Sequence, residues 1–151
     1  MKFREYGIAA ASALVLGIGI AAQAAESALS EYERKSALKQ IAEQHKAATD
    51  RCTTLRDSAR SVCQAEADGR GEVALAQLQL RRDDSGESLR NLARVQASAQ
   101  YRIELARCYD RQDQAKSTCQ RQAQTNLARA FDVIRTDEQM EKSSAVGAGR
   151  R

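Results

Sequence analysis

The chain of 151 residues contains no proline and no tryptophan, and aromatic residues make up only 4% of it. The absence of proline removes the residue that most strongly breaks helices. The shortage of aromatic residues leaves little material for strands, which favour aromatic and β-branched side chains. Large apolar side chains are sparse among the abundant alanine, glutamine and arginine, so any core must be thin and partly lined by alanine. We therefore expect an all-α fold.

Groups typical of catalytic sites are also scarce. The one histidine, His45, lies on an apolar helix stripe, and the sequence places no nucleophile or orienting acid with it. Gly69 and Gly71 lie inside helical sequence and lack the context of a phosphate-binding loop. We therefore expect a protein that is not an enzyme and needs no cofactor, with a packed His45 rather than a catalytic base.

The N-terminus has the layout of a secretory signal peptide. Lys2 and Arg4 precede an uncharged apolar run at 8–22, and Ala22-Gln23-Ala24 is a small-x-small cleavage site. The alternative is a retained membrane anchor, but the run is shorter than the roughly 20 residues that a spanning helix needs. We predict cleavage after Ala24 and export to the periplasm, or beyond the cell envelope.

Export determines how the four cysteines are interpreted. Outside the cytosol, an even number of regularly spaced cysteines indicates disulfides. A four-thiolate zinc site has ligands two to four residues apart, and thiol-disulfide catalysts have a Cys-x-x-Cys motif. Neither arrangement is present, since each cysteine pair encloses ten residues. We therefore expect structural disulfides and no metal.

The spacing also selects the pairing. Residues equidistant from the turn of an antiparallel helical hairpin lie opposite each other, and the midpoints of the two pairs fall at 57–58 and 113–114, where turns are expected. We predict the bonds Cys52–Cys63 and Cys108–Cys119. Each closes a short loop and contributes about 3 kcal/mol in the chain-entropy account.

Apolar periodicity locates the first two helices. A coiled-coil-like seam marks the first, at steps of three and four residues: Leu38, Ile41, His45, Ala48, Cys52 and Leu55. This helix is expected to begin between Ser27 and Ser36. A second helix is expected at about 59–80, capped by Asp57 or Ser58 and weakened by its two glycines. In the resulting hairpin, Ala48 falls opposite Ala67.

The second half repeats the first at an offset of 56 residues, with eight identities in the seventeen positions from Arg51 to Ala67. The third helix carries the apolar stripe Leu89, Leu92, Val95, Ala99, Ile103 and Ala106, and the fourth carries Ala123, Leu127, Ala130 and Ile134. Cys108 lies off the third helix's main stripe, on a second face with Tyr101 and Leu105. We therefore expect this helix to be shared between its own hairpin partner and the other hairpin.

These patterns predict a tandem pair of disulfide-stapled antiparallel helical hairpins, four helices in all, preceded by a signal peptide. The expected boundaries are 1–24 for the signal, 25–82 for the first hairpin, 83–88 for a linker, 89–140 for the second hairpin and 141–151 for a disordered tail.

The residues Ala48, Cys52, Leu55, Ala59, Cys63, Glu66 and Ala67 spell A-x3-C-x2-L-x3-A-x3-C-x2-E-A. Over about 32–134 the chain resembles a group of small, exported, mostly uncharacterised proteins of Gram-negative bacteria that carry this block in tandem. The resemblance implies the same fold and compartment but no activity. The group tends to have Gly-Asn at the turn, where this chain has Asp57-Ser58 and Asp113-Gln114. The second block also has Glu104, Arg111 and Gln122 where the first has Ala48, Leu55 and Glu66.

The net charge of +4 suggests a candidate contact surface. Basic residues surround both turns: Arg51, Arg56 and Arg60 at the first, and Arg107, Arg111 and Lys116 at the second. They suggest weak contact with an anionic membrane surface, although solvated residues on mixed-charge helix faces are the simpler interpretation. Nucleic acid is not an expected partner, because the chain is exported and has few stacking aromatics.

Two functions remain after these exclusions. A structural or interaction protein of the periplasm would complete its narrow apolar seams with another copy or a protein partner. A holding chaperone or stress protein would instead bind unfolded chains through a basic amphipathic surface.

Overall fold

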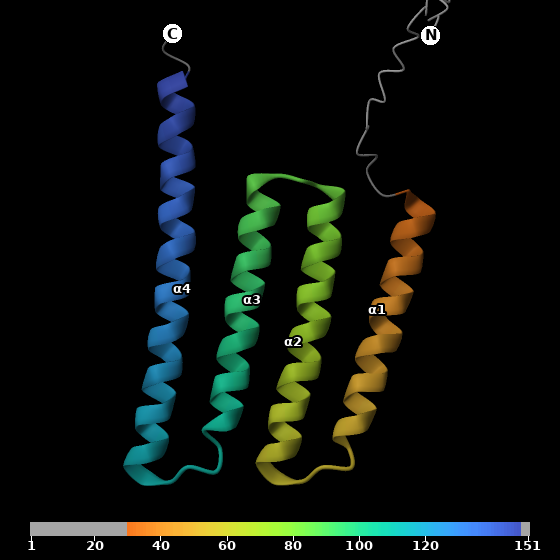
Figure 1. Cartoon of the computed structure of the whole chain (residues 1–151), viewed down its shortest axis with the longest axis vertical. Helices are drawn as coiled ribbons and strands as arrows, with labels where there is room; N and C mark the ends of the chain where they lie inside the picture. The colour runs from red at the N-terminus through yellow and green to blue at the C-terminus, as the bar shows by residue number, and fades with distance from the viewer. Residues whose placement is uncertain (1–29, 149–151) are drawn as a thin grey trace, which may run out of the picture.

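A computed structural model describes residues 30–148, which form four α-helices. They are α1 (Glu31–Cys52), α2 (Asp57–Arg82), α3 (Gly86–Arg107) and α4 (Asp113–Ala148), and the described part contains no strand. Figure 1 shows them side by side in chain order, each antiparallel to the next. The predicted all-α fold with four helices is confirmed. The predicted signal peptide, 1–24, lies outside the described residues.

The helices form a single layer. Within residues 30–148, contacts between helices join only chain neighbours: α1 with α2, α2 with α3, and α3 with α4. Both disulfide turns lie at one end of the row, and the connection between α2 and α3 lies at the other (Figure 1). Because no second layer covers the row, both of its broad faces are open to solvent or to a partner.

The most extensive helix–helix contact joins the two hairpins. It lies between α2 and α3, which run antiparallel beside each other. The expected linker at 83–88 is shorter in the structure, because α3 already begins at Gly86. Ser85 caps this helix through its side-chain oxygen, which accepts a hydrogen bond from the Ser88 backbone at 3.1 Å. The two repeats are therefore fused into one array.

The glycines of α2 are sites of close helix approach. A Cβ atom on Gly69 would lie 3.0 Å from the Cβ of Ala99 on α3, and one on Gly71 would lie 3.1 Å from the His45 ring on α1. Two residues span about 200° around a helix, so the two glycines face opposite neighbours. α2 continues unbroken through both glycines, as the expected helix at 59–80 requires, and the glycines permit tight packing on either side.

The helix starts are stabilised in different ways. Ser30 and Glu33 form a capping box on α1, within the predicted range for its start. On α2 the predicted cap is wrong, because the N-cap residue is Arg56 and no side chain caps the helix. Asp57 instead adopts a left-handed φ of 50°, and Asp113 repeats it with 48°. Ser58 donates its hydroxyl hydrogen bond to Asp110 of the other turn.

The C-terminal helix is longer than the sequence predicts. α4 extends to Ala148, where a disordered tail was expected from 141. Ion pairs explain the extension: Glu138 pairs with Lys142 at 2.7 Å, and Glu141 pairs with Arg90 of α3. The hydrogen bond from Lys142 also lowers the pKa of Glu138. As Figure 1 shows, the end of α4 projects beyond the other helices.

The predicted division of α3 between two neighbours is confirmed. Ala99, on its main stripe, packs against Gly69 of α2, whereas Cys108 is bonded to Cys119 of α4. The seam prediction for α1 fails at its last position, because α1 ends at Cys52 and Leu55 lies in the following turn, partly exposed.

Candidate functional site

Both predicted disulfides are present. Cys52 is bonded to Cys63 with a Cα–Cα distance of 5.6 Å, and Cys108 to Cys119 with 5.8 Å. Both distances lie within the usual range for disulfides. Two bonds of this kind indicate an oxidising, exported compartment.

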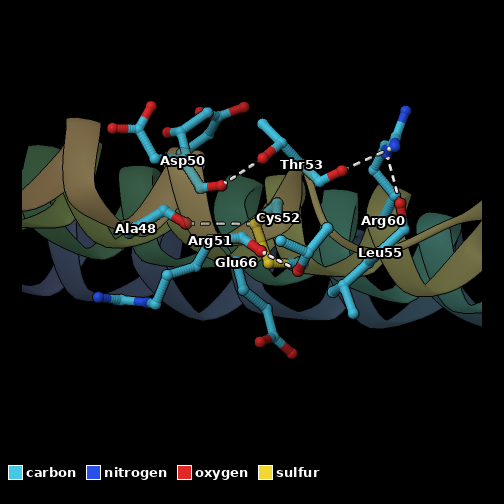
Figure 2. The surroundings of a disulfide bond; sticks show 12 residues. Ala48, Asp50, Arg51, Cys52, Thr53, Leu55, Arg60 and Glu66 are labelled. Atoms are coloured by element: carbon cyan, nitrogen blue, oxygen red, sulfur yellow. Dashed lines mark hydrogen bonds between the residues drawn. A yellow bond between two sulfur atoms is a disulfide. The ribbon is translucent and has the colours of Figure 1, made fainter.

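The first disulfide lies in a small buried cluster. Ala48, Cys52 and Ala67 are all nearly inaccessible to solvent, and Cys63 packs against them. The small side chains of Ala48 and Ala67 allow α1 and α2 to approach closely, as their predicted opposition requires. Figure 2 shows the Cys52 sulfur beside the backbone of Ala48, whose carbonyl oxygen lies 3.3 Å away.

Each turn is held by a different basic side chain. In the first, Arg60 reaches back across the turn and donates to the carbonyl oxygens of Leu55 (2.8 Å) and Thr53 (2.9 Å), as Figure 2 shows. In the second, Lys116 occupies the position equivalent to Arg60. Its ammonium group lies 5.5 Å from the centroid of the Tyr109 ring, in a cation–π contact.

The six basic residues predicted as a contact surface, Arg51, Arg56, Arg60, Arg107, Arg111 and Lys116, all lie near the two turns, at one end of the array. Several have local partners: Arg60 and Lys116 hold their turns, and Arg107 pairs with Glu66 of α2 at 3.2 Å. Acidic residues share this end of the array, among them Asp57, Asp110 and Asp113. Contact with an anionic surface stays a prediction.

A groove of about 680 Å³ opens on one face between α1 and α2. Its lining is Leu38, Ile41, Ala42, His45, Asp68, Gly71, Glu72 and Leu75, with Arg102 reaching in from α3. Leu75 is 46% exposed although it is a large apolar side chain. The volume lies in the range of ligand and peptide pockets.

His45 has a partner that the sequence analysis missed. Its Nε2 lies 2.7 Å from Oδ1 of Asp68, so an acid does orient the ring, contrary to expectation. The ring itself packs over Gly71, in agreement with the packed histidine that was predicted. No serine, threonine or cysteine is among the residues that line this groove.

The sequence contains a usable signal for part of this groove. Asp68, Glu72 and Leu75 follow one another on α2 at steps of four and three, which places them on one helix face. The Arg102–Glu72 ion pair that closes the groove, however, depends on how α3 lies against α2.

Residues 30–148 contain no group of three or more potential metal-ligating side chains, and none of their helices has the length and hydropathy to cross a membrane. Comparison of the chain with protein families, curated proteins and solved structures gives no match. Any functional inference therefore depends on the residues of this chain.

Proposed function

We propose that the protein is a non-catalytic structural or interaction protein of the periplasm, part of the cell envelope, and that it binds a partner helix along one face of its helical layer. The exported compartment suggested by the disulfides and the signal-like N-terminus support the location. The resemblance to small exported Gram-negative proteins points the same way.

One observation carries the proposal: the uncovered groove between α1 and α2. Its floor of Leu38, Ile41 and Leu75 matches the apolar face of an amphipathic helix, which binds through side chains three and four residues apart. The His45–Asp68 hydrogen bond and the Glu72–Arg102 ion pair border this floor and offer polar contacts to the same helix.

A photo-crosslinking amino acid at position 75, introduced into the chain as it is exported, tests the proposal. We expect a discrete adduct with a protein partner, or with a second copy of the chain, and loss of this adduct when Leu38 is replaced by lysine. The matched control places the crosslinker at position 89, where Leu89 is equally apolar and 58% exposed but lies outside the groove.

A chain that stays monomeric at every concentration and gives no position-specific adduct contradicts the proposal. The size of the oxidised protein, measured by light scattering across a concentration series, separates self-association from binding of another protein. If the chain self-associates, the average mass rises with concentration toward that of a homodimer. If it binds another protein instead, the pure chain stays monomeric.

A second candidate, a holding chaperone, is favoured by exposed apolar side chains on three helices. Leu75, Leu89, Val133 and Met140 are each between 46% and 61% exposed. Such scattered apolar surface suits weak binding of many unfolded chains. Suppression of client aggregation by the oxidised protein supports this candidate, and no effect at several-fold molar excess removes it.

A further inference from the structure

Each disulfide has one cysteine that is more accessible to an attacking group than the other. In each bond one sulfur belongs to a buried residue, Cys52 at 0% exposure and Cys108 at 1%. The partner cysteines, Cys63 and Cys119, are only partly buried. Thiol-disulfide exchange needs direct approach of a thiolate to one sulfur atom, so Cys63 and Cys119 are the two positions open to attack.

The surroundings of these two cysteines are not equivalent. Cys63 packs against the buried cluster of Ala48, Cys52 and Ala67, and it does not line either of two grooves between α1 and α2, of about 680 and 170 Å³. Cys119, in contrast, lines a groove of about 760 Å³ between α3 and α4. A small molecule entering this groove therefore meets the second disulfide.

Two replacements between the repeats account for the groove. Glu104 stands where the first hairpin has Ala48, and its side chain accepts hydrogen bonds from Gln100 and Asn126, both at 3.0 Å. A polar network thus replaces the compact alanine contact that shields the first disulfide. Arg111 stands where the first hairpin has Leu55, and it lines the groove.

The charge of the groove favours an anionic ligand. Arg107 and Arg111 both line it, and positive charge near a disulfide attracts and stabilises an approaching thiolate. Glu104 offsets part of this effect, because hydrogen bonds from two neutral amide groups leave its negative charge in place. Arg107 is partly neutralised by Glu66 on α2, so Arg111 is the main source of attraction.

We infer that the Cys108–Cys119 bond is a site of selective thiol-disulfide exchange with small anionic thiols. The thiolate sulfur bonds to Sγ of Cys119 while the bond between Cys108 and Cys119 breaks. Cys108 leaves as a thiolate and takes up a proton from water. A second thiolate then attacks the mixed disulfide, which releases Cys119 and yields the oxidised small-molecule disulfide.

Exchange at this position loosens one helix selectively. Within the described residues α4 contacts only α3, so the second disulfide is its one covalent link to the array apart from the turn itself. The first disulfide still joins α1 to α2, and the extensive α2–α3 contact remains. Reduction therefore removes the covalent clamp on α4 and leaves this helix held to α3 by packing and by the Arg90–Glu141 and Arg94–Glu138 ion pairs.

Limited reduction of the oxidised full chain by glutathione tests the inference. Samples are quenched with an alkylating reagent and mapped by mass spectrometry. We expect glutathione on Cys119 first, and reduction of the second disulfide at least about tenfold faster than the first. Equal rates for the two bonds, or first attack at Cys63, would overturn the inference.

Matched variants show whether the rate of reduction depends on the charge of the groove or on a general loss of stability. Arg111→Leu introduces the residue of the first hairpin, and we expect it to slow the reaction with glutathione several-fold and the reaction with mercaptoethanol less, because the mercaptoethanol thiolate carries less negative charge. Arg129→Leu, at an exposed position outside the groove, should change neither rate. Equal slowing by both variants contradicts a role for the groove charge.

Urea distinguishes direct attack from unfolding. Attack through the groove occurs in the folded protein, so the rate should not respond to urea below the unfolding transition. A rate that rises steadily with low urea would mean that the second hairpin opens before it reacts, and would overturn the inference.

Discussion

The first and second hairpins share a cysteine spacing, a left-handed aspartate and a turn at the same end of the array, yet they close differently. In the first, alanine and cysteine form a compact buried cluster, and Arg60 bonds the carbonyl groups of the turn. In the second, Glu104 forms a polar network and Lys116 lies over Tyr109. The repeat thus preserves the covalent bond and the backbone while packing around the bond diverges.

The two hairpins therefore share the disulfide and the turn backbone but not the packing around them. In the second hairpin Glu104 replaces the counterpart of Ala48 while Ala123 keeps that of Ala67, and a groove opens without a change in helix order. Five experiments test or refine this comparison.

Removal of each disulfide should have the largest effect. We expect Cys52→Ala with Cys63→Ala, and separately Cys108→Ala with Cys119→Ala, to lower the free energy of unfolding by about 3 kcal/mol from loop entropy. The first pair should lose more, because Cys63 packs against the buried cluster, whereas Cys119 lines an open groove. Urea denaturation followed by circular dichroism measures both, and a greater loss from the second pair would contradict the comparison.

Exchanging the divergent residues tests the packing directly. Ala48→Glu places a carboxylate at a position only 7% exposed and should cost about 2–4 kcal/mol, because the charge has no partner there. Glu104→Ala removes only partly exposed hydrogen bonds and should change stability by less than about 1 kcal/mol. Urea denaturation measures the loss of unfolding free energy in both variants, and equal losses would mean that the two hairpins pack alike.

Substitution of the two glycines of α2 compares the helix contact within the first hairpin with the contact between the two hairpins. Gly69→Ala forces the new Cβ against Ala99, so we expect a loss of about 1–2 kcal/mol despite the better helix propensity of alanine. Gly71→Ala meets a His45 ring that can turn aside, and should be neutral or slightly stabilising. Thermal unfolding shows which of the two variants is less stable. A greater loss for Gly71→Ala would place the tighter contact inside the first hairpin.

The basic residues at the turns should contribute smaller amounts. Arg60→Met removes two hydrogen bonds to the turn carbonyls and should cost about 1 kcal/mol. Lys116→Met removes an exposed cation–π contact and should cost about 0.5 kcal/mol. Chemical denaturation resolves the difference, and an equal or larger loss at Lys116 would reverse the assigned roles.

The smallest effect is a pH dependence at the start of α1, which has no equivalent in the second hairpin. Hydrogen bonds from the Ser30 side chain and backbone lower the pKa of Glu33 below its ordinary value of 4.5. A lowered folded-state pKa adds stability above pH 4.5, and this contribution is lost as the pH falls through the folded-state value. Glu33→Gln should flatten this part of the stability curve, and an unchanged curve would exclude the capping box as its source.

Much of the fold followed from local patterns. The helical composition, the three-and-four spacing and the symmetry of the cysteines about each turn predict four helices and both disulfides, because these features depend on residues close in sequence. The sharing of α3 also followed, since Cys108 and Ala99 lie on different faces of one helix. The cap of α2 could not be predicted in this way, because the hydroxyl of Ser58 donates its hydrogen bond to Asp110, which is distant in sequence.

The candidate groove was harder to predict for the same reason. Nothing in the sequence around His45 points to Asp68, and nothing around Glu72 points to Arg102. Each pair joins two helices whose relative rotation and register arise from packing. The close approaches at Gly69 and Gly71 set this packing, and their role becomes apparent only beside Ala99 and His45.

The presence of four helices, the positions of the turns and the pairing of the cysteines follow from local sequence, because hydrogen bonds within a helix and short covalent loops are local. The single layer, the contact of α2 with α3 that joins the two hairpins, and the grooves beside His45 and Cys119 become visible only in the folded structure. These features depend on contacts between residues far apart in the chain, whose geometry follows from the fit of whole helix faces.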